Sequence, residues 1–254
     1  MQPSDSPLLL SVSAEKIWSE KSFSKVQTFV ENIYLCGLIQ KLHSYNLEYC
    51  LMISPVILLI ALCAALNLAL GGIVYLLKLP IYLDMVGTIL CALLLARTPV
   101  KAFLAAAVAG VISFVLGGVF NPFLPWFSLT VVAVAAITAF FTARSESVLR
   151  TGSIANVGFL IRLIGYGVLT GLIAAFMSAP VAVYFFGGVT GSGSALITAF
   201  FLKAGNQLMN AAILSGLTAE PVDKTIQLTL AVMLLRATPN NIVGRIREAA
   251  ALKG

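Results

Sequence analysis

The stretch Leu79-Pro-Ile-Tyr-Leu-Asp-Met-Val-Gly-Thr88 decides how the rest of the chain folds, because it places one carboxylate, Asp84, between two long apolar runs. The run before it covers residues 53–77, and Pro80 favours a helix end at this point. A lone acid at the mouth of an apolar span is costly unless it has a partner or a water-filled pocket. We therefore interpret the stretch as the first wall of a small-molecule site that opens at a membrane surface.

The composition is that of a membrane protein. Hydrophobic residues make up 59% of the chain and charged residues only 10%, with a mean hydropathy of +0.99, whereas about a quarter of the residues of a soluble domain are charged. Apolar runs near the ~20 residues needed to cross a bilayer recur without period-2 alternation. The sequence therefore predicts an all-α, polytopic helical bundle.

The net charge of +6 indicates orientation rather than nucleic-acid binding, because the basic residues lie at the ends of apolar runs. Six spans are predicted, at about residues 53–77, 81–96, 102–120, 127–141, 157–177 and 221–235. With both termini inside, the basic loops at 97–101 and 144–150 and the tail at 245–253 all fall on the cytoplasmic side.

The apolar segment 194–217 does not fit this count, since a further span would send the arginine-rich tail outside. It carries Lys203, Asn206, Gln207 and Asn210, spaced to lie near one helical face. We expect a re-entrant or interfacial helix before the last span, with its polar face toward a cavity, because protein or water must cover such an element.

Residues 1–50 form a polar N-terminal extension, and residues 51–254 form the membrane domain. The extension does not have the pattern of a secretory signal peptide. Two interpretations stay open: residues 26–38 form an amphipathic surface helix, or Met52 is the native start. Of the four cysteines, Cys63 and Cys91 lie inside apolar runs and are expected to be buried thiols.

Several polar motifs flank the predicted spans, each with a structural alternative. Asn121 and Trp126 supply a hydrogen bond and a stacking face to a ligand, or cap a turn and anchor the membrane interface. The glycine-rich stretch 187–193 lacks the lysine of a phosphate loop, so it is either a flexible turn or a place of close backbone approach to a ligand. Glu220 and Asp223 are either a helix N-terminal acid pair or a polar cluster across the cavity from Asp84.

Small residues recur every fourth position in the first span, at Ala61, Ala65 and Ala69. Such a strip lets another helix approach closely. The spacing leaves open whether the contact is internal or with another protein.

Together these motifs resemble the substrate-binding S component of an energy-coupling factor (ECF) transporter, the vitamin-uptake class of ABC importer. The resemblance covers residues 52 to 254, and it is carried by these motifs: Ala61-x-x-x-Ala65 with Asn67, the stretch 79–88, Asn121-Pro122, the glycines of 187–193, Asp223-Lys224 and Pro239.

The resemblance implies a bundle of about six helices that captures a vitamin or related nutrient and has no ATPase, cofactor or catalytic activity of its own. It implies partners, namely a membrane T component that packs on Ala61 and Ala65, and two cytoplasmic ATPases, in a bacterial or archaeal plasma membrane. The expected substrate-binding residues are Tyr82, Asp84, Asn121, Trp126, Gly188, Thr190, Ser192, Asn206, Asn210, Asp223 and Lys224.

Two other functions compete with this interpretation. A self-sufficient carrier would couple transport to ions through Asp84 and either Asp223 or Glu220. A membrane enzyme or sensor module is less favoured, since the bundle contains no histidine and no His-Glu-x-x-His zinc motif. The residues suit thiamine-like, pyridoxine-like, pantothenate-like and nucleobase-like substrates equally.

Overall fold

The computed structural model describes residues 47–77, 79, 81–152, 156–188, 190 and 193–251, with side chains from Pro55 onward. The chain divides into two units, Met1–Leu51 and Met52–Gly254, and the second contains the features below. The predicted surface helix at 26–38 and the candidate residue Ser192 lie outside the described residues.

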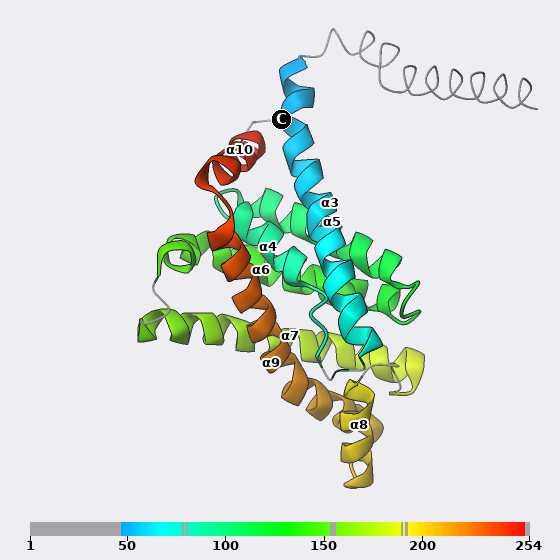
Figure 1. Ribbon diagram of the computed structural model, residues 1–254. Helices are drawn as coiled ribbons and strands as arrows, with labels where there is room; N and C mark the ends of the chain where they lie inside the picture. The colour runs from blue at the N-terminus through cyan, green and yellow to red at the C-terminus, as the bar shows by residue number, and fades with distance from the viewer. Residues whose placement is uncertain are drawn as a thin grey trace, which may run out of the picture. The chain divides into compact units, whose positions relative to one another are not determined.

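All regular structure within the described residues is helical, as predicted (Figure 1). The elements are α3 (Leu47–Leu76), α4 (Val86–Leu94), α5 (Pro99–Gly117), the 3-10 helix η1 (Leu124–Phe127), α6 (Ser128–Thr151), α7 (Val157–Phe186), α8 (Ser194–Lys203), α9 (Leu208–Ala237) and α10 (Asn240–Ala251). Four segments are long and apolar enough to cross a membrane: Pro55–Leu76, Pro99–Gly117, Leu124–Thr151 and Val157–Phe186. The chain is therefore a multi-pass membrane protein.

The second predicted span, 81–96, is not a full-length helix. Only α4, nine residues long, is helical there, which gives about 14 Å of helix against a hydrocarbon core of about 30 Å. Residues 81–83 before it are not helical, and the backbone N–H groups of Tyr82 and Leu83 donate to the side chain of Asp223 in α9 rather than to a helix of their own. Eight of the nine residues of α4 are buried, so this short helix lies in the core.

The predicted re-entrant helix, 194–217, and the last predicted span, 221–235, do not have the predicted bounds. Residues 194–217 form α8 and the first third of α9, separated by a turn at 204–207 in which Gly205 has a left-handed φ of 88°. The remainder of α9 continues through Pro221 to Ala237 as one 30-residue helix. Helix α7 likewise continues through Pro180 to Phe186. A proline removes only one helical hydrogen bond, and in a membrane bundle neighbouring helices can cover the carbonyl group that is left without a donor.

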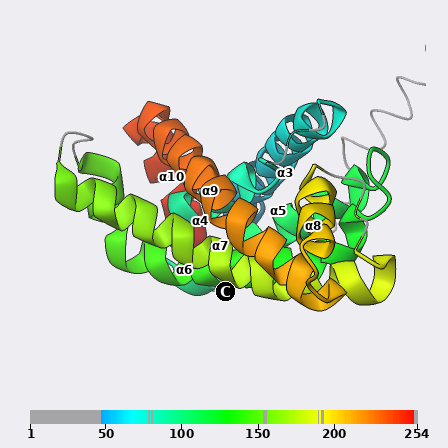
Figure 2. The ribbon, with the colours of Figure 1, turned by 90° about the horizontal axis from the view of Figure 1, so that it is seen from below.

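Helices α7 and α9 form the most extensive helix pair, with α9 running obliquely across α7 in Figure 2. Their close approach depends on small residues. A Cβ added at Gly171 would lie 2.4 Å from Cα of Pro221, and one at Gly167 would lie 2.3 Å from Oγ1 of Thr225. This contact holds the polar middle of α9, around Pro221 and Thr225, against α7.

Arginines bind the helix ends at one end of the bundle. Arg236 donates hydrogen bonds to the carbonyl oxygens of Leu149 and Gly152 at the end of α6, at 2.7–3.1 Å. Arg247 of α10 donates to the carbonyl oxygen of Leu94, where α4 ends, and forms a 2.6 Å ion pair with Glu146. These bonds satisfy carbonyl groups that a helix end leaves open. The opposite helix ends surround the candidate site.

Candidate functional site

Side chains of α9 fix the segment that carries Asp84. Oδ1 of Asp223 accepts hydrogen bonds from the backbone N–H groups of Tyr82, at 2.9 Å, and Leu83, at 3.2 Å. Oε1 of Gln227 accepts one from the N–H of Met85 at 3.2 Å. Leu83 has a positive φ of 50°, which L side chains rarely adopt. The segment is therefore held in a strained path between α3 and α4 by partners from α9.

Asp223 is engaged on both carboxylate oxygens. Its Oδ2 accepts from Nζ of Lys224 at 2.7 Å and from Nε2 of Gln227 at 2.8 Å. Asp223, Lys224 and Gln227 are each at most 1% exposed. With four donors around it, Asp223 is a positioning residue for the 81–85 segment and for the Lys224 ammonium.

Asn67 of α3 fixes the start of α4 in a similar way. Its Oδ1 accepts from the backbone N–H of Gly87 at 2.6 Å, and its Nδ2 lies 2.9 Å from Oγ1 of Thr88 and 3.2 Å from Oγ of Ser113. A helix start leaves its first N–H groups without partners inside the helix, and Asn67 fills one of these positions from another helix. Helices α3, α4 and α5 are thereby joined beside the cavity.

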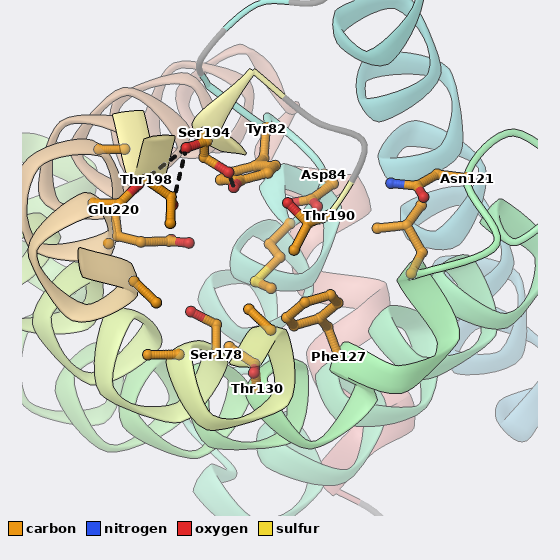
Figure 3. Close-up of a pocket in the computed structure, with 18 of the residues that line it drawn as sticks. Tyr82, Asp84, Asn121, Phe127, Thr130, Ser178, Thr190, Ser194, Thr198 and Glu220 are labelled. Carbon is orange, nitrogen blue, oxygen red and sulfur yellow. Dashed lines mark hydrogen bonds between the residues drawn. The ribbon is translucent and has the colours of Figure 1, made fainter. Parts of the chain in front are cut away.

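A cavity of about 80 Å³ lies between the 81–85 segment, the end of α5, η1, the start of α6, the end of α7, α8 and α9 (Figure 3). This is room for roughly five to eight waters, or for a small organic molecule. Its polar lining is Tyr82, Asp84, Asn121, Thr130, Ser178, Thr190, Ser194, Thr198, Ser215, Glu220 and Lys224. Its larger apolar lining is Met85, Phe114, Leu124 and Phe127.

The cavity contains buried oxygens without hydrogen-bond partners among the described residues. They are Oδ1 of Asp84, Oε2 of Glu220 and Oγ1 of Thr130. Asp84 is 9% exposed and Glu220 is 7% exposed. Oε2 of Glu220 does form an ion pair with Nζ of Lys224, at 3.3 Å. Because buried polar atoms in folded proteins are nearly always paired, such a group of oxygens makes this cavity the candidate ligand site.

A chain of hydroxyl bonds closes one side of the cavity. The Tyr82 hydroxyl donates to Oγ of Ser194 at 2.5 Å, and Oγ of Ser215 donates to the Ser194 carbonyl oxygen at 3.1 Å. These bonds connect the 81–85 segment, α8 and α9, and Figure 3 shows Tyr82 and Ser194 together at the edge of the cavity. A ligand that enters from this side therefore passes the start of α8.

The structure brings six of the predicted substrate-binding residues to the cavity wall: Tyr82, Asp84, Asn121, Gly188, Thr190 and Lys224. Asn121 is 6% exposed, and its Oδ1 also accepts from the N–H of Phe123 at 3.1 Å. Asp223 lies behind the wall as a support.

Three predicted residues lie away from the cavity. Trp126 is 54% exposed and packs on Phe185, with ring centroids 5.0 Å apart. Asn206 donates to the carbonyl oxygen of Phe201 at the end of α8, and Asn210 is exposed. The polar face predicted for 194–217 does not form, because the turn at 204–207 interrupts the helix on which that spacing was counted.

The sequence analysis did not identify the serine and threonine hydroxyl groups that line the cavity. Thr130 is the one among them whose hydroxyl has no hydrogen-bond partner among the described residues. Ser178 and Thr198 donate to carbonyl groups of their own helices, as hydroxyls in apolar helices commonly do. Thr130 has no partner among the described residues, although it is only 3% exposed. No local sequence signal separates it from the other threonines of α6, so only the assembled bundle identifies it.

The alanine strip lies on the outside of the unit. Ala61, Ala65 and Ala69 are all exposed, and the large side chains beside them, Leu58 and Leu62, are 59% and 60% exposed. The inner face of the same helix carries Asn67 and Cys63, and Cys63 and Cys91 are free, buried thiols as predicted. The strip is thus available to lipid or to another membrane protein.

Comparison of the chain with protein-family models, curated proteins and solved structures gave no match. The site geometry and the sequence patterns therefore carry the functional argument.

Proposed function

We propose that this chain is the substrate-binding S component of an ECF-type ABC importer, which takes up a vitamin or related small nutrient. The observation that carries the proposal is the cavity, whose buried Asp84 carboxylate has an oxygen without a partner at the end of the bundle opposite the arginines. A site that binds a polar nutrient within an apolar bundle needs such an enclosed group of hydrogen-bonding side chains.

The proposal places the cavity at the outer side of a bacterial or archaeal plasma membrane. The arginine-rich helix ends, with Arg97, Arg150, Arg236 and Arg247, then face the cytoplasm, in agreement with the positive-inside rule. In this topology the membrane is crossed six times, by the four apolar helices, by the segment 81–94 and by α9. Both ends of the unit then lie on the cytoplasmic side. The energy comes from two partner ATPases through a T component.

Replacing Asp84 by asparagine is expected to weaken ligand binding roughly ten- to hundredfold, because a hydrogen bond to a charged group contributes about 1.5–3 kcal/mol. The measurement is calorimetric titration of the purified protein with the compound that co-purifies with it, identified by mass spectrometry. Glu248→Gln, an exposed acid of α10, is the matched control and should leave affinity unchanged. Equal affinity in the Asp84→Asn protein would remove this carboxylate from the site.

Replacing Ala65 by tryptophan is expected to abolish uptake while leaving substrate binding intact. Bulk on an exposed strip of small residues prevents the close approach of a partner helix, whereas the residues that line the cavity all lie outside α3. Uptake by cells that also express the T component and ATPases, together with co-purification of the T component, checks this.

The control for this substitution is Ala136→Trp, the same change at an exposed alanine of α6. It should spare both uptake and co-purification. Normal uptake by the Ala65→Trp protein would show that the strip faces lipid alone.

A second function, ion-coupled carriage by this chain alone, is favoured by one observation: Asp84, Glu220 and Lys224 line the same buried cavity. Reconstitution separates the two functions. In liposomes that contain only this chain, a carrier accumulates substrate when a sodium or proton gradient is imposed, and an S component does not.

A further inference from the structure

We infer that the ligand of this cavity is a small organic cation that carries N–H donors and binds between Asp84 and Glu220. The inference deepens the proposed function, on which it rests only in taking this ligand to be the transported nutrient. Its starting point is two carboxylates, each at least 91% buried, that each have an oxygen without a hydrogen bond among the described residues. The oxygen of Asp84 also has no ion pair there, whereas that of Glu220 is ion-paired with Lys224.

The charges around the cavity favour a cationic ligand. Within the described part of the chain, three carboxylates meet one ammonium here: Asp84, Glu220 and Asp223 against Lys224. The ammonium contacts Asp223 at 2.7 Å and Glu220 at 3.3 Å, while Asp84 has no ion-pair partner among the described residues. A buried carboxylate without a compensating charge is strongly unfavourable. A ligand with one or two positive charges compensates this excess.

The buried oxygens of the cavity favour a ligand that donates hydrogen bonds. An ionised carboxylate only accepts hydrogen bonds, so Oδ1 of Asp84, which has neither a hydrogen bond nor an ion pair among the described residues, requires a donor from the ligand. Oε2 of Glu220 is ion-paired with Lys224 at 3.3 Å but accepts no hydrogen bond there, so it can accept one from the same ligand. The hydroxyl of Thr130 supplies one further group of either kind. An ammonium, an amidinium or an amino-substituted, protonated heterocycle meets this requirement, since each carries a positive charge on atoms with N–H groups.

The apolar part of the wall favours a ligand with a ring or short hydrocarbon. Phe114, Phe127 and Met85 line the cavity together with the ring of Tyr82, and Figure 3 shows Phe127 and Thr130 on the side of the cavity away from Tyr82 and Ser194. Aromatic faces attract cations and also cover an apolar body. The wall therefore suits a cationic group attached to a ring or short hydrocarbon.

The same features disfavour an anionic ligand. Lys224 is the one basic residue among the described residues that line the cavity, and its ammonium is already paired with two carboxylates. A carboxylate ligand would meet Asp84 and Glu220 without a free cation to bind. Of the substrate classes that the sequence leaves open, those with a positive charge fit and pantothenate-like acids do not.

The test compares four probes of similar size on the purified, ligand-free full chain: benzylamine, benzamidine, benzyl alcohol and benzoate. The shift in melting temperature and calorimetric titration report binding at millimolar concentration. We expect the two cations to bind at least tenfold more tightly than the alcohol, and benzoate not to bind. In Asp84→Asn and Glu220→Gln this preference should fall by at least tenfold, and in Glu248→Gln it should persist.

Several results would overturn the inference. The first is equal binding of benzyl alcohol and benzylamine, which would indicate that the carboxyl groups are neutral. The second is binding of benzoate, and the third is that neither benzylamine nor benzamidine binds. A cation preference that persists in both Asp84→Asn and Glu220→Gln would also overturn the inference. The melting temperature of each ligand-free variant shows whether the variant folds.

The compound released when the native protein is denatured gives an independent readout. A cation in the mass spectrum supports the inference, and a neutral or anionic compound contradicts it. The outcome is separable from that of the proposed function. A chain that prefers cations but shows no ATPase-dependent uptake contradicts only the transport role, and a chain that imports an anion contradicts only the ligand class.

Discussion

Asp223→Ala is expected to lower the stability of the membrane unit more than any other single change at the site. The substitution removes the acceptor of four hydrogen bonds and leaves the Lys224 ammonium, 1% exposed, with Glu220 as its remaining ion-pair partner. Removing one partner of a buried ion pair costs about 3–5 kcal/mol. The melting temperature in detergent, measured at one scan rate for all variants, should fall by many degrees.

Two comparison variants make this result interpretable. Glu248→Ala removes an exposed acid of α10 and should change the melting temperature by little. Asp223→Leu combined with Lys224→Met removes both charges, so it should recover part of the loss, although the N–H groups of Tyr82 and Leu83 stay without their acceptor. A melting temperature for Asp223→Ala equal to that of Glu248→Ala would show that α9 does not position the 81–85 segment.

The second large effect is expected from Gly87→Ala. A Cβ at this position would lie 2.0 Å from the backbone carbonyl oxygen of Cys63 and 3.0 Å from Oδ1 of Asn67. Backbone cannot move aside as a flexible side chain can, so α3 and α4 must separate, and the 2.6 Å bond from Gly87 to Asn67 is lost. Overpacking of this kind costs about 1–3 kcal/mol or more.

Thermal unfolding again provides the measurement, and Gly72→Ala is the control on α3. A Cβ at Gly72 meets nothing within 4 Å, and alanine is the better helix former, so this variant should be as stable as the parent or slightly more stable. If the two substitutions shift the melting temperature equally, α3 and α4 do not make the close contact described above.

The sequence predicted the class of the fold because composition decides it. Runs of apolar residues exclude a water-facing surface, and in a bilayer the backbone must satisfy its own hydrogen bonds, which favours helices. The positions of the arginines were also informative, because they can be read directly from the local sequence. Arg236 and Arg247 follow the last predicted span in the sequence, and in the structure they bond to carbonyl groups at the ends of α6 and α4.

Helix bounds were predicted less well where distant side chains decide them. Residues 81–85 are apolar enough to read as the start of a span, yet their N–H partners, Asp223 and Gln227, lie some 140 residues further along the chain. The polar residues of 194–217 were placed on one helical face, but a turn at Gly205 sends Asn206 to cap α8. Neither outcome follows from a local pattern.

The sequence by itself determined that this chain is a helical, multi-pass membrane protein and that Asp84 is a carboxylate in need of a partner. Only the tertiary structure decided which residues face Asp84, because the packing of α9 on α7 brings Glu220, Asp223 and Lys224 to the 81–85 segment. It also separated the roles of the acids: Asp223 is saturated by four donors, Glu220 is ion-paired with Lys224, and Asp84 keeps an oxygen with neither kind of partner among the described residues. Hydrogen-bond saturation depends on the positions of distant donors in space, and spacing along a helix does not encode those positions.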